Sequence, residues 1–158
     1  MNVVCPGCGL AMPRNPAAPP DGYYNCSPEC WSVYTEVLEK EYSNAVFFGR
    51  VHQMTVDSYA VQHAGGPHPD KSVDVHLVGL HLVLIDGVRP PDVPPRLQQL
   101  VSRTKVWPHF EPPANAGPLT VFDVALADDH AVTVRAWAEQ VLSAWAAHHA
   151  AIAALARG

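Results

Sequence analysis

The sequence predicts a mainly α-helical protein, with a helical bundle behind a small cysteine module at the N-terminus. Apolar residues recur at three- and four-residue steps through several segments, which predicts helices with one buried face. The hydrophobic fraction of 48 % in 158 residues is sufficient for one main core. All four cysteines lie within the first 30 residues, which predicts that the module is separate from the helical pattern.

The first 25 residues are expected to form a loop. They contain many prolines and glycines, which interrupt regular structure, and few large apolar side chains. Such a segment cannot build its own core and needs a cross-link, such as a disulfide or a bound metal ion, to fold. A first helix is expected over residues 27–44, because Ser27 is a favourable N-cap, Pro28 suits the first helical position and Glu29 complements the helix dipole.

The rest of the chain alternates helical patterns with proline-rich loops. Residues 50–63 favour a helix, although the alternation of apolar and polar residues at 54–58 leaves a strand open. Residues 72–86 are apolar almost all round, which is typical of a central buried helix. The remaining elements are expected to be a short amphipathic helix with Leu97, Leu100 and Val101, a short helix or strand over 120–127 beginning with the capping pair Thr120 and Asp123, and one long helix over 128–157.

The four cysteines have the spacing of a zinc site. Cys5 and Cys8 form one close pair, Cys26 and Cys30 form the other, and each pair can bind one side of the same ion. Gly9 permits the tight turn that follows the first pair. The second pair lies at the start of the first helix, where the helix dipole favours thiolates. The pattern therefore predicts a structural zinc ion bound by all four cysteines.

A loop knuckle followed by a helix N-terminus resembles the treble-clef class of zinc finger. The predicted fold class is thus a helical bundle with an N-terminal treble-clef-like zinc finger, divided into a zinc module over residues 1–30 and a bundle domain over 31–158 that form one integrated unit. The alternatives for the cysteines are two disulfides, four unrelated thiols, or a redox pair at Cys5 and Cys8. Cytosolic chains rarely hold structural disulfides, and a redox pair does not need a second pair of cysteines.

Nine histidines suggest a second metal site. The strongest local cluster contains His63 at the end of a helix, His68 and Asp70 in the following Gly-Pro loop, and His76 about one turn into the next helix. Three imidazoles with an open position would suit Zn²⁺, Fe²⁺, Ni²⁺ or Mn²⁺. The plain alternative is that loop histidines are solvated and core histidines bond to backbone carbonyl groups.

A rival histidine set faces the core of the bundle. It consists of His52 and His81 with His148 or His149, and Asp57 is a candidate for proton transfer or for orienting a ligand. His52 and His63 cannot share an ion, because eleven residues of helix separate them by about 16 Å.

Charge and hydropathy exclude some partners. The formal net charge is −5 and no basic cluster appears, which disfavours nucleic acid because its binding depends on neutralising phosphates. No run of eighteen apolar residues occurs, so no membrane-spanning helix is expected. The first residues lack the basic and apolar regions of a secretion signal. We therefore expect a cytoplasmic protein.

The segments CPGCG, CSPECW, VHQMTVDSYAVQH, HPDKSVDVHL and WPHFEPP together resemble an uncharacterised bacterial family, a domain of unknown function, over nearly the whole chain. The resemblance implies that the cysteine module belongs with the bundle and that the histidine segment is a recurrent feature. Histidines on a compact helical bundle are also similar to those of DinB-like metal-dependent proteins, in which three histidines from different helices surround one ion. That likeness is at the level of the fold alone.

Two functions are consistent with these patterns. The first is a zinc-stapled protein in which His63, His68 and His76 hold a second divalent ion for a reaction on a small molecule, with His52, Asp57, His148 or His149 as acid, base or additional ligand. The second is a non-catalytic binding or scaffold protein whose only metal is structural zinc and whose surface engages a protein partner.

Overall fold

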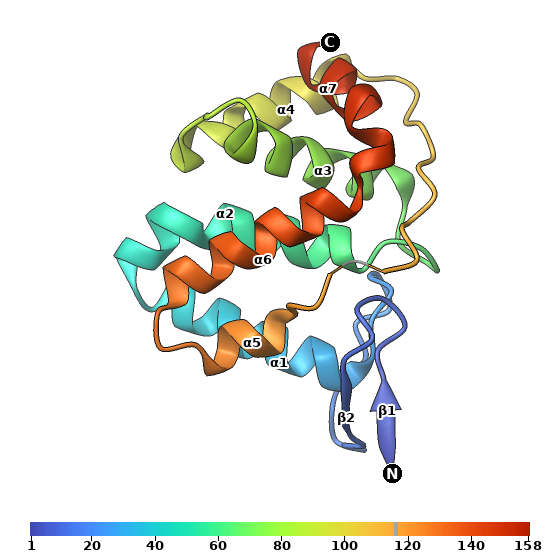
Figure 1. Cartoon of the computed structure of the whole chain (residues 1–158), viewed down its shortest axis with the longest axis vertical. Coiled ribbons are helices and arrows are strands. Elements are labelled where there is room, and N and C mark those ends of the chain that lie inside the picture. The colour runs from blue at the N-terminus through green and yellow to red at the C-terminus, as the bar shows by residue number, and fades with distance from the viewer. Residues whose placement is uncertain (116) are drawn as a thin grey trace.

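The computed structural model describes residues 1–115 and 117–158 and is mainly helical, as the sequence predicts. Figure 1 shows the elements in chain order, with the two termini at opposite ends of the longest axis. The elements are β1 (Asn2–Val4), β2 (Ala11–Pro13), α1 (Pro28–Tyr42), α2 (Ala45–Gln62), α3 (Asp70–Leu84), the 3₁₀ turn η1 (Pro90–Asp92), α4 (Val93–Arg103), α5 (Val121–Leu126), α6 (His130–Ala144), the 3₁₀ turn η2 (Ala146–His148) and α7 (His149–Arg157). None of the helices in the described ranges is both long and apolar enough to cross a membrane.

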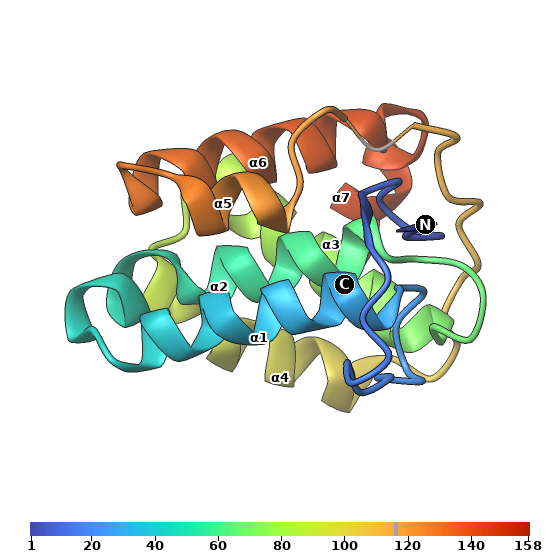
Figure 2. The ribbon, with the colours of Figure 1, turned by 90° about the horizontal axis from the view of Figure 1, so that it is seen from below.

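Helix α2 is the centre of the bundle. It packs against α1, α3 and α6, while α5 covers α1, and α4 and α7 cover α3 (Figure 2). The C-terminal part of α2, residues 57–62, is buried on every side. Polar groups in this part of the helix must therefore find partners inside the protein, because water cannot reach them.

The N-terminal segment contains a short hairpin where the sequence predicted only a loop. Strands β1 and β2 are antiparallel, with Val3 opposite Met12. The turn between them is closed by two backbone bonds, from the Cys5 N–H to the Leu10 carbonyl (2.8 Å) and from the Gly9 N–H to the Cys5 carbonyl (2.9 Å). Gly9 has φ of 78°, a conformation that favours glycine. Three-residue strands carry too little periodic pattern to be predicted from sequence.

The start of helix α2 differs from the prediction, whereas the cap predicted at Thr120 is present. Helix α2 begins five residues earlier than expected, because Asn44 caps it by accepting hydrogen bonds from the backbone of Val46 and Phe47. The segment predicted as a short helix or strand over 120–127 is helix α5, and the Thr120–Asp123 capping box is confirmed.

The prediction of one helix over residues 128–157 is wrong. The helix ends at Ala144, continues as one 3₁₀ turn and restarts as α7 at His149. The His149 Nε2–H donates to the Leu142 carbonyl over 2.8 Å and so satisfies one of the groups freed by the break. The break lets α7 pack against α3, where Ile152 is fully buried. Apolar periodicity continues across the turn, so the pattern alone does not reveal it.

A buried carboxylate joins three helices. Glu41 of α1 has no exposed surface and accepts hydrogen bonds from Thr55 Oγ1 (2.6 Å) and His52 Nδ1 (3.0 Å) of α2, and from His130 Nε2 (2.7 Å) of α6. A buried carboxylate is costly unless it is hydrogen-bonded in this way. Each bond contributes about 1 kcal/mol, so the three bonds together hold the packing of α1, α2 and α6 in one arrangement.

Asp74 of α3 is buried and neither of its carboxylate oxygens has a hydrogen-bond partner among the described residues. Burial, together with the nearby charge of Asp70, raises the pKa of Asp74 to about 7 against the opposing effect of His109. The folded state therefore favours the protonated carboxyl, whereas the unfolded chain loses this proton near pH 4.

We predict that Asp74→Asn stabilises the protein at pH 8. Because the folded-state pKa of Asp74 is raised, the unfolded state loses its proton first, and Asp74 costs stability progressively from about pH 4 to about pH 7. The substitution removes this cost and should raise the free energy of unfolding by about 1 to 3 kcal/mol at pH 8 in a urea titration. The gain should disappear below pH 4.

The matched control is Asp128→Asn, which removes an exposed carboxylate and should change stability by less than about 0.5 kcal/mol at either pH. An Asp74→Asn variant that is less stable than the wild type at pH 8 contradicts the account of Asp74.

Candidate metal centre

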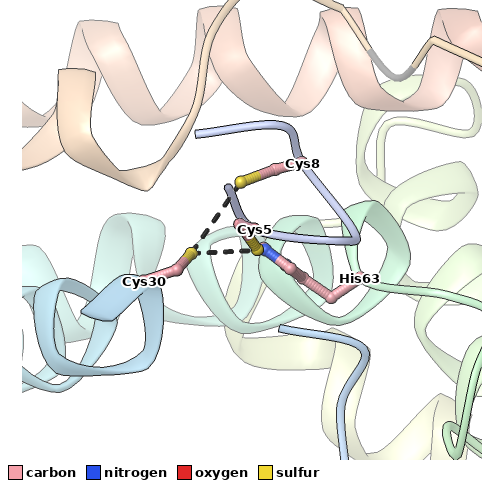
Figure 3. Close-up of side chains that lie close together, drawn as sticks. All are labelled: Cys5, Cys8, Cys30 and His63. Atoms are coloured by element: carbon pink, nitrogen blue, oxygen red, sulfur yellow. Dashed lines mark hydrogen bonds between the residues drawn. The ribbon is translucent and has the colours of Figure 1, made fainter. Parts of the chain in front are cut away.

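Three cysteines and one histidine converge at the end of the bundle next to the hairpin. The ligand atoms of Cys5, Cys8, Cys30 and His63 all lie within 4.8 Å of one another. Figure 3 shows these four side chains pointing toward a common centre, although they come from the hairpin turn, from α1 and from the end of α2. Across the described ranges, this is the only group of three or more Cys, His, Asp or Glu ligand atoms so close together.

The separations fit a tetrahedral zinc ion. The Sγ atoms of Cys8 and Cys30 are 3.8 Å apart, and Cys30 Sγ lies 3.4 Å from His63 Nε2. A tetrahedron with Zn–S bonds of about 2.3 Å and a Zn–N bond of about 2.0 Å has edges of about 3.8 Å between sulfurs and about 3.5 Å between sulfur and nitrogen. These two separations therefore match the edges of such a site, and the remaining pairs of ligand atoms lie within 4.8 Å.

The turn of the hairpin contains two members of the group, Cys5 and Cys8. Cys5 follows β1 and is buried, and Cys8 lies in the turn before β2. The turn packs directly on His63 at the end of α2. A Cβ atom added to Gly7 would lie 2.6 Å from His63 Cδ2 and 2.9 Å from His63 Cα. It would also clash with the Asn25 carbonyl oxygen. Only glycine fits at this contact.

Cys30 is the third helical residue of α1 and has no exposed surface. Its backbone N–H donates to the Oγ of the N-cap residue Ser27 over 3.1 Å. This cap fixes the first turn of α1, and the helix dipole there favours a thiolate. The predicted N-cap thus also positions a ligand.

His63 ends α2 and is fully buried. Its Nδ1–H donates to the Tyr59 carbonyl over 2.6 Å, which leaves the Nε2 lone pair directed at the thiols. A hydrogen bond from the second ring nitrogen to a carbonyl is the usual arrangement of a metal-binding histidine, because it fixes both the tautomer and the ring orientation. The Tyr59 ring stacks on the His63 ring with centroids 3.9 Å apart and limits its rotation.

The three thiols are strongly coupled. Hydrogen bonds from Cys30 and Cys8 lower the pKa of Cys5, whereas donation to Cys5 and Cys8, together with burial, raises the pKa of Cys30. Hydrogen bonding to Cys30 favours the Cys8 thiolate, but Cys5 and burial outweigh it and raise the pKa of Cys8 to about 12. Thiols must be deprotonated to bind a metal ion. Metal binding therefore releases protons to the solvent and weakens as the pH falls.

Cys26 lies beside this group and is not one of its members. The Tyr59 hydroxyl lies near both sulfurs and donates to Cys30 Sγ over 3.5 Å. Burial raises the pKa of Cys26 to about 11, and a hydrogen bond with Tyr59 opposes the rise. Of the four predicted zinc ligands, the structure therefore brings together Cys5, Cys8 and Cys30, with His63 in the fourth place.

The structure does not bring His63, His68 and His76 together around one point. His63 belongs to the cysteine group. His68 donates from Nδ1 to the His63 carbonyl (3.1 Å) and accepts at Nε2 from the Ser72 hydroxyl (2.7 Å). His76 donates from Nδ1 to Asp57 Oδ1 over 2.7 Å.

The remaining candidates are also hydrogen-bonded separately. His52 donates to Glu41, His148 to the Glu111 carbonyl and His149 to the Leu142 carbonyl. His81 faces Asp86 over 3.5 Å, so the rival set of core-facing histidines does not converge either. Asp57 is fully buried between Gln53 and His76, and burial raises its pKa despite the hydrogen bond from His76.

Sequence reasoning did not place His63 with the cysteines. The residue lies 33 positions after Cys30, and no fixed spacing connects them. Glu41 and His130, which also form a buried polar cluster, belong to no sequence motif that would predict their contact. The one available signal was Gly7 between the first two cysteines, since a glycine inside a knuckle can indicate a close packing contact.

Comparison with known proteins identifies a family and nothing closer. A family model described as "Family of unknown function (DUF5946)" matches residues 3–146, a range that contains all four residues of the group. No curated protein and no solved structure matches the chain. The expectation of an uncharacterised family is confirmed, whereas a bacterial origin and the treble-clef class stay predictions.

We predict that Gly7→Ala lowers the zinc affinity at least ten-fold. The added methyl group overlaps His63 and the Asn25 carbonyl, so the turn must move away from its fourth ligand. A competition titration with a chromophoric chelator measures the change. The matched control is Gly49→Ala, where the new Cβ meets nothing within 4 Å and the affinity should stay within two-fold of the wild type. An unchanged affinity in Gly7→Ala contradicts the tight contact.

Proposed function

We propose that this chain, which belongs to the DUF5946 family of unknown function, is a non-catalytic binding protein whose fold is fastened by one structural zinc ion. The ligands are Cys5, Cys8, Cys30 and His63. The observation that carries the proposal is the convergence of four ligand atoms within 4.8 Å, two of whose separations, 3.8 Å and 3.4 Å, match the edges of a tetrahedral site.

The chemistry of the donors favours zinc. Three thiolates and one imidazole form the Cys₃His set of structural zinc sites, and soft sulfur ligands disfavour magnesium, calcium and manganese. The His63 ring is oriented by the Tyr59 carbonyl, and Cys5 and Cys30 are buried. A site with four protein ligands has no open position for substrate, which supports a structural role over a catalytic one.

The ion would connect the hairpin to two helices, α1 and α2, that already pack on each other. The hairpin supplies Cys5 and Cys8, the first turn of α1 supplies Cys30, and the end of α2 supplies His63. Direct contacts of the N-terminal segment include hydrogen bonds from the Asn25 N–H to the His63 carbonyl and from Asn25 Nδ2 to the Ala64 carbonyl, both 3.1 Å long. A third runs from the Asn15 N–H to Glu29 Oε1 over 3.0 Å. The binding free energy of the ion therefore contributes directly to folding of the N-terminal segment.

We propose no second ion. Among the described residues, neither His68 nor His76 belongs to a group of three or more converging ligand atoms. Both ring nitrogens of His68 are hydrogen-bonded, to the His63 carbonyl and to Ser72, and His76 donates to Asp57. This use of histidines as hydrogen-bonding links favours the binding protein over the metal-dependent enzyme among the two functions that the sequence allows.

The metal content of untagged purified protein tests the proposal. We predict about one zinc per chain by elemental analysis, lost in Cys30→Ser and in His63→Ala and retained in Cys26→Ser. Chelation should unfold the hairpin and lower the melting temperature, because the bound ion stabilises the folded state by mass action. Cys26→Ser is the matched control for the loss of one thiol near the site.

Two outcomes contradict the proposal. One is zinc that is retained in His63→Ala and lost in Cys26→Ser, which would indicate a four-cysteine site. The other is a melting temperature that does not change when the zinc is removed, which would exclude a structural role.

A further inference from the structure

A cavity of about 570 Å³ is lined by the N-terminal half of α2, whereas His63 of the metal centre lies at the C-terminal end of that helix. It opens between the N-terminal half of α2, the C-terminal end of α3, the first turn of α6 and the segment that connects α3 to α4. Its volume is within the range of small-molecule sites in proteins. The cavity and His63 lie toward opposite ends of α2, so a ligand here would not contact the metal ligands.

The floor of the cavity is aliphatic. Val51 and Met54 of α2 and Val83 of α3 are buried beneath it, and Val88 forms one side. No aromatic side chain lines it within the described residues. A surface of this kind offers dispersion contacts to a flexible aliphatic group, and methionine adapts to such a group more readily than a branched residue does.

The rim of the cavity is cationic. Arg50, Arg89 and Arg135 line it, from a chain that has only 10 lysines and arginines and a net charge of −5. None of the described lining residues is an aspartate or a glutamate. Arg89 pairs with Asp92 and Arg135 pairs with Glu139, but both pairs are more than half exposed and so contribute little to stability. Arg50 has no ion pair among the described residues, and a guanidinium group can bind an anion bidentately.

Gly49 keeps the mouth of the cavity open. Of the ten glycines in the chain, seven have positive φ and two, Gly7 and Gly79, lie against atoms that would clash with a Cβ. Gly49 has neither reason: it is helical, and a Cβ added there would meet nothing within 4 Å. Glycine inside a helix costs stability relative to alanine. Gly49 lines the cavity and a Cβ there would meet open space, so a role in leaving the cavity accessible accounts for this cost.

We propose that this cavity binds a small anionic ligand that consists of an aliphatic chain and a carboxylate or phosphate head group. The chain lies on Val51, Met54 and Val83, and the head group is bound by Arg50 with Arg89 or Arg135. The proposal specifies the ligand class for the binding role of the bundle proposed above, and it does not depend on the identity of the metal ion.

Isothermal titration of the zinc-replete full-length protein tests this site with three probes that share one tail: decanoate, decyl phosphate and decyltrimethylammonium. We expect one-to-one saturable binding of at least one anionic probe, and binding at least ten-fold weaker for the cation. The stronger of the two anions identifies the head group. Raising the salt concentration should weaken the anions, because the arginine rim is exposed.

Three variants locate the site. Gly49→Leu fills the opening while improving helix propensity, so it should fold as well as the wild type and bind the anion at least ten-fold more weakly. Arg50→Gln should weaken binding about five-fold. The matched control is Arg96→Gln on α4, which removes an exposed arginine outside the cavity and should leave affinity within two-fold of the wild type.

The proposal is overturned if neither anion gives saturable binding, if the cation binds equally well, or if Gly49→Leu binds as tightly as the wild type. Zinc content measured on the same samples separates this failure from failure of the metal site. If a sample contains one zinc per chain and binds no anion, the proposed anion site is wrong and the proposed structural zinc is unaffected.

Discussion

The hydrogen bond from His63 Nδ1 to the Tyr59 carbonyl is the constraint on which the metal centre depends. It fixes the imidazole so that Nε2 faces Cys30 at 3.4 Å, and the stacked Tyr59 ring prevents the side chain from rotating away. Tyr59 in turn stacks on Tyr34 of α1 with centroids 3.8 Å apart and parallel planes. The orientation of one ligand is therefore set by the packing of α1 on α2. The position of the hairpin turn then follows, because Gly7 lies against that same imidazole.

Histidines connect the bundle by hydrogen bonds to backbone carbonyls and buried carboxylates. Each of the nine has a partner within 3.5 Å. Helix α2 is buried at its C-terminal end and contains Asp57, while Glu41 packs on it from α1. A neutral imidazole can donate to such groups without adding a second buried charge. His52, His76 and His130 thus provide partners for the buried carboxylates of Glu41 and Asp57.

The helices and most of the candidate site could be predicted from the sequence, for identifiable reasons. Apolar periodicity indicates a helix with one buried face. Cap residues such as Ser27 and Thr120 bond to residues close to them in sequence, so the starts of α1 and α5 could be predicted. Cys5 and Cys8 are joined by a short turn, so their spacing alone predicts a shared ion.

The rest of the site required tertiary structure. His63 reaches the cysteines because α2 is folded against α1, a relation that no local spacing encodes. The break at Trp145 was missed for a similar reason: apolar periodicity passes through the turn, and the helix ends there because α7 packs on α3. The arginine rim was missed because Arg50, Arg89 and Arg135 come from three separate segments of the chain.

X-ray absorption spectroscopy of the zinc-loaded protein tests the central claim most directly, because it counts the sulfur and nitrogen atoms bound to the ion. The account predicts three sulfurs at about 2.3 Å and one imidazole nitrogen at about 2.0 Å, with the same spectrum in Cys26→Ser. A first coordination sphere of four sulfurs would contradict it, since His63 would then not be a ligand and the hairpin would be fastened to α1 alone.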